Sequence, residues 1–215
     1  MKFKGFAGMD RSGSSGNFPL VIATIISRNK NQINECYESI FRFASKINPI
    51  FSSRREIKSR DFNNTNSRTS VLDILKKFEV RCNVLFVSGK VSEIIRNYSA
   101  KYKYYQKIEA CLWFECLRAA AARGGIFPQV IFVDETYSGK DQELFVSAIK
   151  SLIENRLMLS PIIETADSRF ENAVKLADIV AGFFKADSNI QNNNKQFLIS
   201  FDNKLITEYM EETVR

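Results

Sequence analysis

Histidine is absent from this chain of 215 residues, and its absence removes several classes of catalytic site. Without an imidazole there is no Ser-His-Asp or Cys-His catalysis, no Cys2His2 zinc site, no histidine ligand of a nuclease metal and no histidine proton relay. Any chemistry must therefore come from carboxylates, lysine, tyrosine, hydroxyl groups or thiols.

Cysteine motifs and long apolar runs are also missing. The four cysteines, Cys36, Cys82, Cys111 and Cys116, form no Cys-x-x-Cys pair, which favours buried thiols in a reducing compartment over disulfides or zinc. No apolar run approaches the roughly 20 residues of a membrane span, and residues 1–5 lack the apolar core of a signal peptide. We expect a cytoplasmic protein with no membrane partner.

Negative charge is in the minority. The chain has 31 Lys and Arg against 24 Asp and Glu, a formal net charge of +7, which favours a polyanionic partner, nucleic acid before a membrane surface. Its 45% apolar residues are typical of a globular protein. We expect one domain over residues 1–215, with a polar, partly mobile segment at about residues 50–69 and an extension after about residue 187.

Apolar periodicity predicts an alternation of strands and helices. Residues 3–10 and 18–27 are apolar runs separated by turn residues, which predicts an antiparallel hairpin whose first strand ends at Asp10. Further strands are predicted near 81–88, 130–133, 161–164 and 197–201, and helices near 32–47, 70–78, 91–123, 141–157 and 170–184, with an Asn-rich spacer after Asp187. An antiparallel start that leads into β-α-β crossovers predicts a three-layer α/β fold with a mixed central sheet and flanking helices.

Three acidic residues lie where such a fold could build a metal site. Asp10 and Asp134 each follow an apolar strand, so their carboxylates converge if the two strands are central and parallel. Asp178 lies in an apolar helix whose small residues allow a close approach to the sheet: Ala173, Ala177, Ala181 and Gly182. Carboxylates suit Mg²⁺ or Mn²⁺, and two such ions hydrolyse phosphodiesters without histidine. The alternative is that these acids are turn initiators or helix caps.

Several motifs occur in a characteristic order over roughly residues 3 to 184. They are Asp10-Arg11-Ser12-Gly13, Glu56-Ile57-Lys58, Val133-Asp134, Asp167-Ser168 and Leu176-Ala177-Asp178-Ile179-Val180-Ala181-Gly182. This pattern resembles the uncharacterised family known as domain of unknown function 3800, which looks like a member of the ribonuclease H-like superfamily. The Leu-Ala-Asp segment is the most specific of these motifs, and Glu-Ile-Lys alone is weak.

The resemblance implies a ribonuclease H-like fold and a divalent-metal-dependent nuclease, or a related phosphodiester-processing enzyme, that acts on DNA or RNA. It implies that the catalytic and metal-binding residues are Asp10, Glu56, Asp134 and Asp178, with Asp167 as an outer metal ligand, around one or two Mg²⁺ or Mn²⁺ ions. Glu109 and Glu115, on the helix that precedes the Asp134 strand, compete with Glu56, which we favour.

The chain departs from the family pattern at two positions. Arg11 replaces the usual Glu after the first Asp, and Lys175 replaces the usual Gln before Leu-Ala-Asp. These residues either alter the metal affinity or mark a divergent branch. They also keep open a second function, that of a non-catalytic nucleic-acid-binding or interaction protein on a ribonuclease H-like scaffold.

Basic residues supply the predicted contacts to nucleic acid. One group surrounds Glu56 and the other is interleaved with tyrosines, a composition suited to phosphates and stacked bases: Arg54, Arg55, Lys58, Arg60, Lys101 and Lys103. The alternatives are an ordinary solvated loop for the first group and core packing for the tyrosines. DNA against RNA, endonuclease against exonuclease, and a homodimer all stay open.

Overall fold

A six-stranded mixed sheet forms the middle of the computed structural model, which describes residues 2–13, 19–54, 56–87, 97, 105–199 and 208. The strands are β2 (Phe6–Ser12), β3 (Leu20–Ser27), β4 (Arg81–Val87), β6 (Val130–Asp134), β7 (Ile162–Ala166) and β8 (Leu198–Ile199), in the spatial order β7-β6-β2-β3-β4-β8. β2, β3 and β4 are antiparallel neighbours, whereas β6 runs parallel to both β2 and β7. A separate parallel pair joins β1 (Lys2–Phe3) to β5 (Ile126–Phe127).

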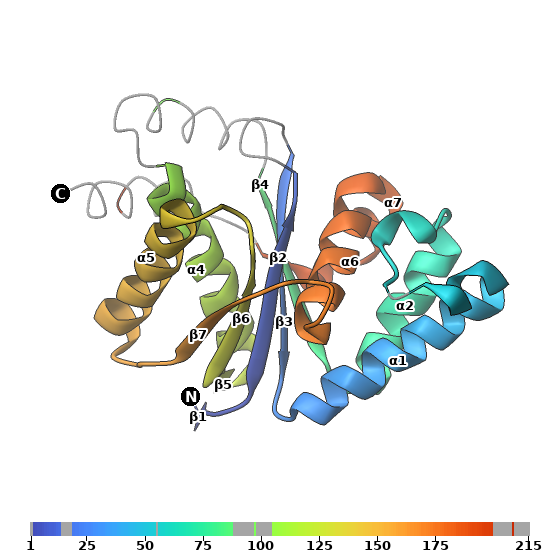
Figure 1. Cartoon of the computed structure of the whole chain (residues 1–215), viewed down its shortest axis with the longest axis horizontal. Coiled ribbons are helices and arrows are strands. Elements are labelled where there is room, and N and C mark those ends of the chain that lie inside the picture. The colour runs from blue at the N-terminus through green and yellow to red at the C-terminus, as the bar shows by residue number, and fades with distance from the viewer. Residues whose placement is uncertain are drawn as a thin grey trace.

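Helices cover both faces of this sheet (Figure 1). On one face lie α4 (Tyr105–Gly124) and α5 (Lys140–Leu157), and on the other lie α1 (Lys30–Ile47), α2 (Thr65–Lys77), α6 (Asn172–Ala186) and α7 (Ser188–Asn193). Each layer of helices encloses its own apolar core against the sheet. The predicted three-layer α/β architecture, with a mixed sheet that starts from an antiparallel hairpin, is therefore confirmed.

The first long strand ends later than its sequence predicts. β2 continues past Asp10 to Ser12, because its last residues stay paired with β3 while its pairing with β6 stops at Met9. Asp10 thus lies within a paired strand, where the backbone is held on one side and the other side is open toward the end of β6.

The polar segment at residues 50–69 contains two short 3-10 helices, η1 (Pro49–Ser53) and η2 (Ser59–Asp61), and the start of α2. Between its many polar residues, the side chains of Ile57 and Phe62 are buried in the core on the α6 face. The Phe62 ring stacks on Phe43 and meets Phe183 of α6 edge-on. Two widely spaced apolar residues therefore suffice to dock this segment against the helix.

Two predicted loops are helical because a polar side chain caps each helix. α2 begins at Thr65 instead of near residue 70, since the Asn64 side chain accepts a hydrogen bond from the backbone N–H of Ser67. The Asn-rich spacer forms α7 and a 3-10 helix, η3 (Lys195–Phe197), and the Asp187 carboxylate caps α7. The start of the predicted helix near 91–123 and the end of the predicted strand near 197–201 lie outside the described residues, which leave out 88–96, 98–104 and 200–207.

Two glycines set the position of α6. A Cβ on Gly8 of β2 would lie 2.2 Å from the Ala173 carbonyl carbon, and a Cβ on Gly182 would lie 2.1 Å from the Ser59 hydroxyl. Neither contact leaves room for a side chain, so α6 approaches both the sheet and the η2 segment at very short range. The predicted close approach of this small-residue helix is confirmed.

The cysteines agree with the sequence-based prediction of buried thiols. All four cysteines are buried free thiols. No helix that the structure describes is long and apolar enough to cross a membrane.

Candidate functional site

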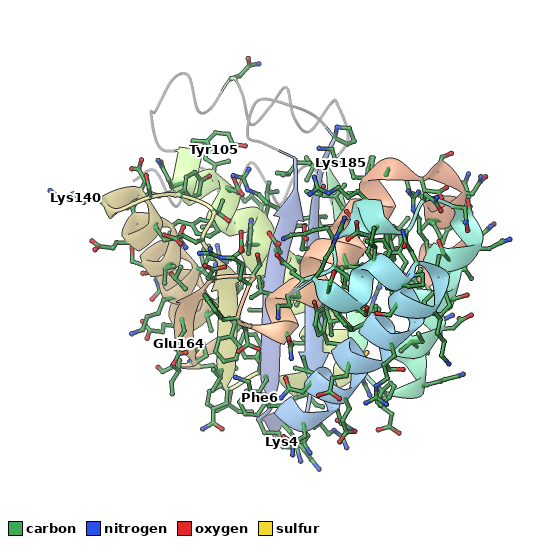
Figure 2. The ribbon with its side chains drawn as sticks, turned by 45° about the vertical axis from the view of Figure 1, so that its right-hand side comes forward. Lys4, Phe6, Tyr105, Lys140, Glu164 and Lys185 are labelled. Carbon is green, nitrogen blue, oxygen red and sulfur yellow. The ribbon has the colours of Figure 1, made fainter. Side chains whose placement is uncertain are left out.

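The two acids at the carboxyl ends of β2 and β6 lie side by side. Met9 of β2 pairs with Val133 of the parallel strand β6, so Asp10 and Asp134 follow at neighbouring positions. Met9 and Val133 both belong to the core under α4, and side chains alternate along a strand, so the two carboxylates point to the α6 face. This end of the sheet lies opposite Phe6 and on the same side as Tyr105 and Lys185 (Figure 2).

The third acid comes from α6. Because α6 is pressed against β2 at Gly8, Asp178 lies above the same end of the sheet, close enough for its charge to act on both Asp10 and Asp134. The convergence of these three acids is the geometry that their positions in the sequence predict.

Glu56 and Lys58 reach the site together from the segment before η2. Ile57 between them is fully buried, so on this extended backbone the two charged side chains flank the buried one and share the opposite side. The Lys58 ammonium Nζ lies 2.8 Å from Glu56 Oε1 and 3.2 Å from Asp178 Oδ2. Glu56, which we favour over Glu109 and Glu115, therefore lies in the same site as the acids of the sheet and α6. Lys58 lies in this site as well.

Burial and mutual repulsion dominate the electrostatics of this carboxylate cluster, by which we mean Asp10, Glu56, Asp134 and Asp178. Burial raises the pKa of Asp10 well above its ordinary value, and the neighbouring charges of Asp134 and Asp178 raise it further. Burial and the charge of Asp178 likewise raise the pKa of Asp134. Burial also raises the pKa of Asp178, although Lys58 opposes this shift. The cluster thus has more negative charge than its surroundings neutralise.

Two carboxylate oxygens of the cluster have an ion-pair partner but no well-aligned hydrogen bond. Glu56 Oε1 and Asp178 Oδ2 are buried and accept no well-aligned hydrogen bond from a described group, yet both lie within ion-pair distance of Lys58. Buried carboxylate oxygens without aligned hydrogen bonds are favourable positions for a cation.

Asp167, the outer candidate, lies at the rim of the cluster. Its charge raises the pKa of Asp134, but Arg169 engages both of its oxygens, through Nε at 2.8 Å and 3.1 Å. The hydrogen bonds from Arg169 hold the pKa of Asp167 below its ordinary value. Asp167 is therefore already neutralised by a partner of its own.

The competitors of Glu56 lie on the other face of the sheet. Glu109 of α4 is fully buried and forms an ion pair with Arg11, whose Nε lies 3.1 Å from Glu109 Oε1. Tyr137 and Trp113 each donate a hydrogen bond to the same carboxylate. Arg11 follows Asp10 in β2 and so points the opposite way, to the α4 face and away from the other acids of the site.

Glu115 and Lys175 are also engaged outside the cluster. Glu115 pairs with Arg118 on α4, at 2.8 Å between Oε2 and Nη2. Lys175 donates to Asn172 Oδ1 and lies over the Tyr37 ring. Neither residue contacts the carboxylates at the end of β2.

The predicted nucleic-acid contacts have different environments. Arg60 is exposed beside the cluster, whereas Arg54 is tied to Asp61 at 2.9 Å and lies over the Phe51 ring. Lys58 contacts the acids themselves. The remaining predicted contacts, Arg55, Lys101 and Lys103, lie outside the described residues.

The donor chemistry of the cluster fits a hard divalent cation, because every ligating group is a carboxylate and the group carries excess negative charge. Among the residues that the structure describes, no three acidic or thiol groups surround one point closely enough to form a ready ion site. Two of the four acids, Glu56 and Asp178, form ion pairs with Lys58.

The sheet order and the flanking helices form an α/β fold with a mixed sheet, which solved structures of ribonuclease H-like fold share. A chain of the PCNA:RNase HII complex from Archaeoglobus fulgidus aligns with 98% of this chain and 91% of its own length, with a TM-score of 0.53 and 16% identity. Ribonuclease H2 from Pyrococcus horikoshii OT3 aligns over 97% and 86%, with a TM-score of 0.58 and 19% identity. No protein-family model and no curated protein matches the sequence.

Proposed function

We propose that this protein is a divalent-metal-dependent nuclease of the cytoplasm that acts on DNA or RNA. Its catalytic and metal-binding carboxylates are Asp10, Glu56, Asp134 and Asp178. The observation that carries the proposal is the convergence of these acids, from two parallel strands, one helix and one loop, on a site with too little positive charge. The fold shared with ribonucleases HII supports the reaction class. The order of the sequence motifs supports membership of the family of unknown function, although no family model matches the chain.

In this proposal Asp10 and Asp134 hold Mg²⁺ or Mn²⁺, and Asp178 and Glu56 complete the negative field around it. The bound cation would supply Lewis acidity toward a phosphate oxygen and a more acidic water. The chain itself fixes the carboxylates: β2 and β6 hold Asp10 and Asp134 in register, and α6 is clamped on Gly8. The exposed Arg60 lies beside the cluster, where it can contact a flanking phosphate.

The test is cleavage of labelled single- and double-stranded DNA and RNA with Mg²⁺, Mn²⁺ or chelator. Asp134→Asn and Asp178→Asn should each lower the cleavage rate at least 100-fold, because each removes a ligand charge, while substrate affinity stays within a few-fold. Asp73→Asn is a control, since Asp73 pairs with Lys76 on α2 and takes no part in the cluster. Cleavage that persists in chelator or in both cluster variants contradicts the proposal.

A second candidate is a non-catalytic nucleic-acid-binding protein, favoured by the ion pairs of Lys58 with Glu56 and Asp178. If the Lys58 ammonium permanently neutralises Glu56 and Asp178, the protein keeps its fold but binds no divalent metal ion. This protein would bind nucleic acid with a salt-dependent affinity that chelator does not change, and it would cleave no substrate.

A further inference from the structure

Lys58 is enclosed by acceptors in the way that a bound cation is. An ammonium carries three N–H donors, and three oxygens surround this one: Glu56 Oε1 at 2.8 Å, Asp178 Oδ2 at 3.2 Å and Ser168 Oγ at 3.4 Å. They come from three separate segments, the stretch before η2, α6 and the loop after β7. The ammonium therefore forms ion pairs with two carboxylates of the cluster and donates a hydrogen bond to the Ser168 hydroxyl.

The backbone that carries Lys58 is fixed on both sides. Ile57 before it is fully buried, and the Lys58 N–H donates to Asp61 Oδ2 at 2.8 Å. Ser59 after it is pressed against Gly182 of α6, where no Cβ fits. Lys58 is thus a held part of the site, unlike a lysine on a solvated loop, and its side chain is only 34% exposed.

Lys58 is also the cation that the described ion pairs assign to the carboxylate cluster. Arg169 is engaged by Asp167, and Arg11 is engaged by Glu109 on the other face of the sheet. Arg60 and Lys175 act on single acids of the cluster through their charge, Arg60 on Asp178 and Lys175 on Glu56. Burial and the neighbouring acids keep the pKa of Asp10 and of Asp134 raised, although the Lys58 charge lowers both, so the side of Asp10 and Asp134 is the less compensated part.

We infer that Lys58 is a built-in second cation of this site, and that the site consequently binds one divalent ion, on the side of Asp10 and Asp134, instead of two. The inference rests on the proposed metal-dependent function and deepens it. Two divalent ions about 3.5–4 Å apart need acids between and around them, and here Lys58 already engages two of the four. The Lys58 ammonium is a fixed single positive charge that replaces an exchangeable metal ion. Lys58 is therefore a positioning residue for Glu56 and Asp178.

The inference fixes what a neutral residue at position 58 should do. Lys58→Met keeps an unbranched chain of similar length but removes the charge, which leaves Glu56 and Asp178 without the ammonium that pairs with both of them. Two carboxylates in that arrangement attract a hard cation, so a second divalent ion should enter. Lys58→Arg keeps the charge and should keep the number of ions.

The experiment counts Mn²⁺ ions on the whole chain by isothermal titration calorimetry and by the electron paramagnetic resonance of bound Mn²⁺. The wild type and Lys58→Arg should bind one Mn²⁺ per chain with the signal of an isolated ion. Lys58→Met should bind two, with the spin-coupled signal of a close pair. Lys30→Met is the matched control, because Lys30 is 40% exposed, pairs with Glu171 at 2.8 Å outside the cluster, and should leave the count at one.

Each outcome has a separate meaning. Two ions on the wild type, or one ion on a folded Lys58→Met, overturns the inference and leaves the proposed nuclease intact. No ion on the wild type overturns the proposed function itself. Since the wild-type count needs no substitution, the inference remains testable even if Lys58→Met fails to fold.

Discussion

The two faces of strand β2 hold buried acids whose pKa burial raises in both cases, but their partners differ. On the α4 face, Glu109 is fully buried, yet Arg11, Tyr137 and Trp113 satisfy its carboxylate. On the α6 face, Asp10 is 5% exposed and accepts one described hydrogen bond, from the backbone N–H of its neighbour Arg11.

This difference distinguishes an acid that stabilises the fold from acids that prepare a site. A buried carboxylate with an arginine and two donors is held in one arrangement. Buried carboxylates that repel one another, and whose pKa values stay raised despite the nearby ammonium of Lys58, destabilise the folded chain until a cation binds. Adjacent residues of one strand, Asp10 and Arg11, thus serve different purposes because their side chains point to different faces.

The largest expected effect is on the satisfied face. Glu109→Ala leaves the Arg11 guanidinium, 13% exposed, without its charged partner and should lower the free energy of unfolding by about 3–5 kcal/mol. Urea denaturation followed by circular dichroism measures this loss. Glu115→Ala is the control on the same helix, with an expected loss of about 1 kcal/mol because its partner Arg118 is 41% exposed and can turn to water. Equal losses for the two variants would contradict the contrast between the faces.

The second-largest effect is the stabilisation that Mn²⁺ should give at the carboxylate cluster, on the α6 face of the sheet. Mn²⁺ at 100 times its dissociation constant should stabilise the wild type by about 2.7 kcal/mol, which raises the melting temperature by roughly 5–11 °C for a chain of this size. Asp134→Asn should lose most of this rise, whereas Glu109→Gln, on the other face, should keep it in full. Differential scanning calorimetry with and without chelator measures both. A rise that survives Asp134→Asn places the ion elsewhere.

A smaller effect concerns pH in the absence of metal. Because the pKa of Asp10 is raised in the folded protein, the folded chain binds this proton more tightly than the unfolded chain does. Stability therefore falls as pH rises above about 3.9, the ordinary Asp value, and levels off once the raised pKa is passed. Asp10→Asn removes this contribution, so at pH 7 in chelator it should be more stable than the wild type by about 1 kcal/mol. Identical pH slopes for the two proteins would falsify the assignment of a raised pKa, through burial and neighbouring acids, to Asp10.

The sequence predicts the acids of the α6 face, because their positions follow from local patterns. It does not predict the ion pair of the α4 face, because that pair joins distant segments. Strand ends at Asp10 and Asp134 and a small-residue helix around Asp178 are local patterns, and they predict the convergence that the structure has. The pairing of Arg11 with Glu109 joins a strand to a distant helix, and no local pattern encodes it.

The position of Lys58 is an intermediate case. The alternation Glu56-Ile57-Lys58 already signals an extended stretch with the isoleucine inside and both charges on one side. What the sequence does not contain is the depth to which that stretch docks, which depends on the contact of Ser59 with Gly182 across the fold. A basic residue predicted to meet phosphates therefore turns out to contact the acids.

The smallest effect tests which face receives the nucleic acid. Arg60 is exposed beside the carboxylate cluster, and Lys150 is 53% exposed on α5, over the opposite face. Arg60→Ala should weaken binding of a labelled oligonucleotide a few-fold and reduce the salt slope of log K by about 0.7–0.9, the share of one phosphate contact. Lys150→Ala should change neither quantity, and both variants should stay within about 0.5 kcal/mol of wild-type stability. Fluorescence anisotropy across a salt series decides the matter: equal slopes for the two variants would mean that net charge attracts the polymer without orienting it, and the acids would then have no privileged access to its backbone.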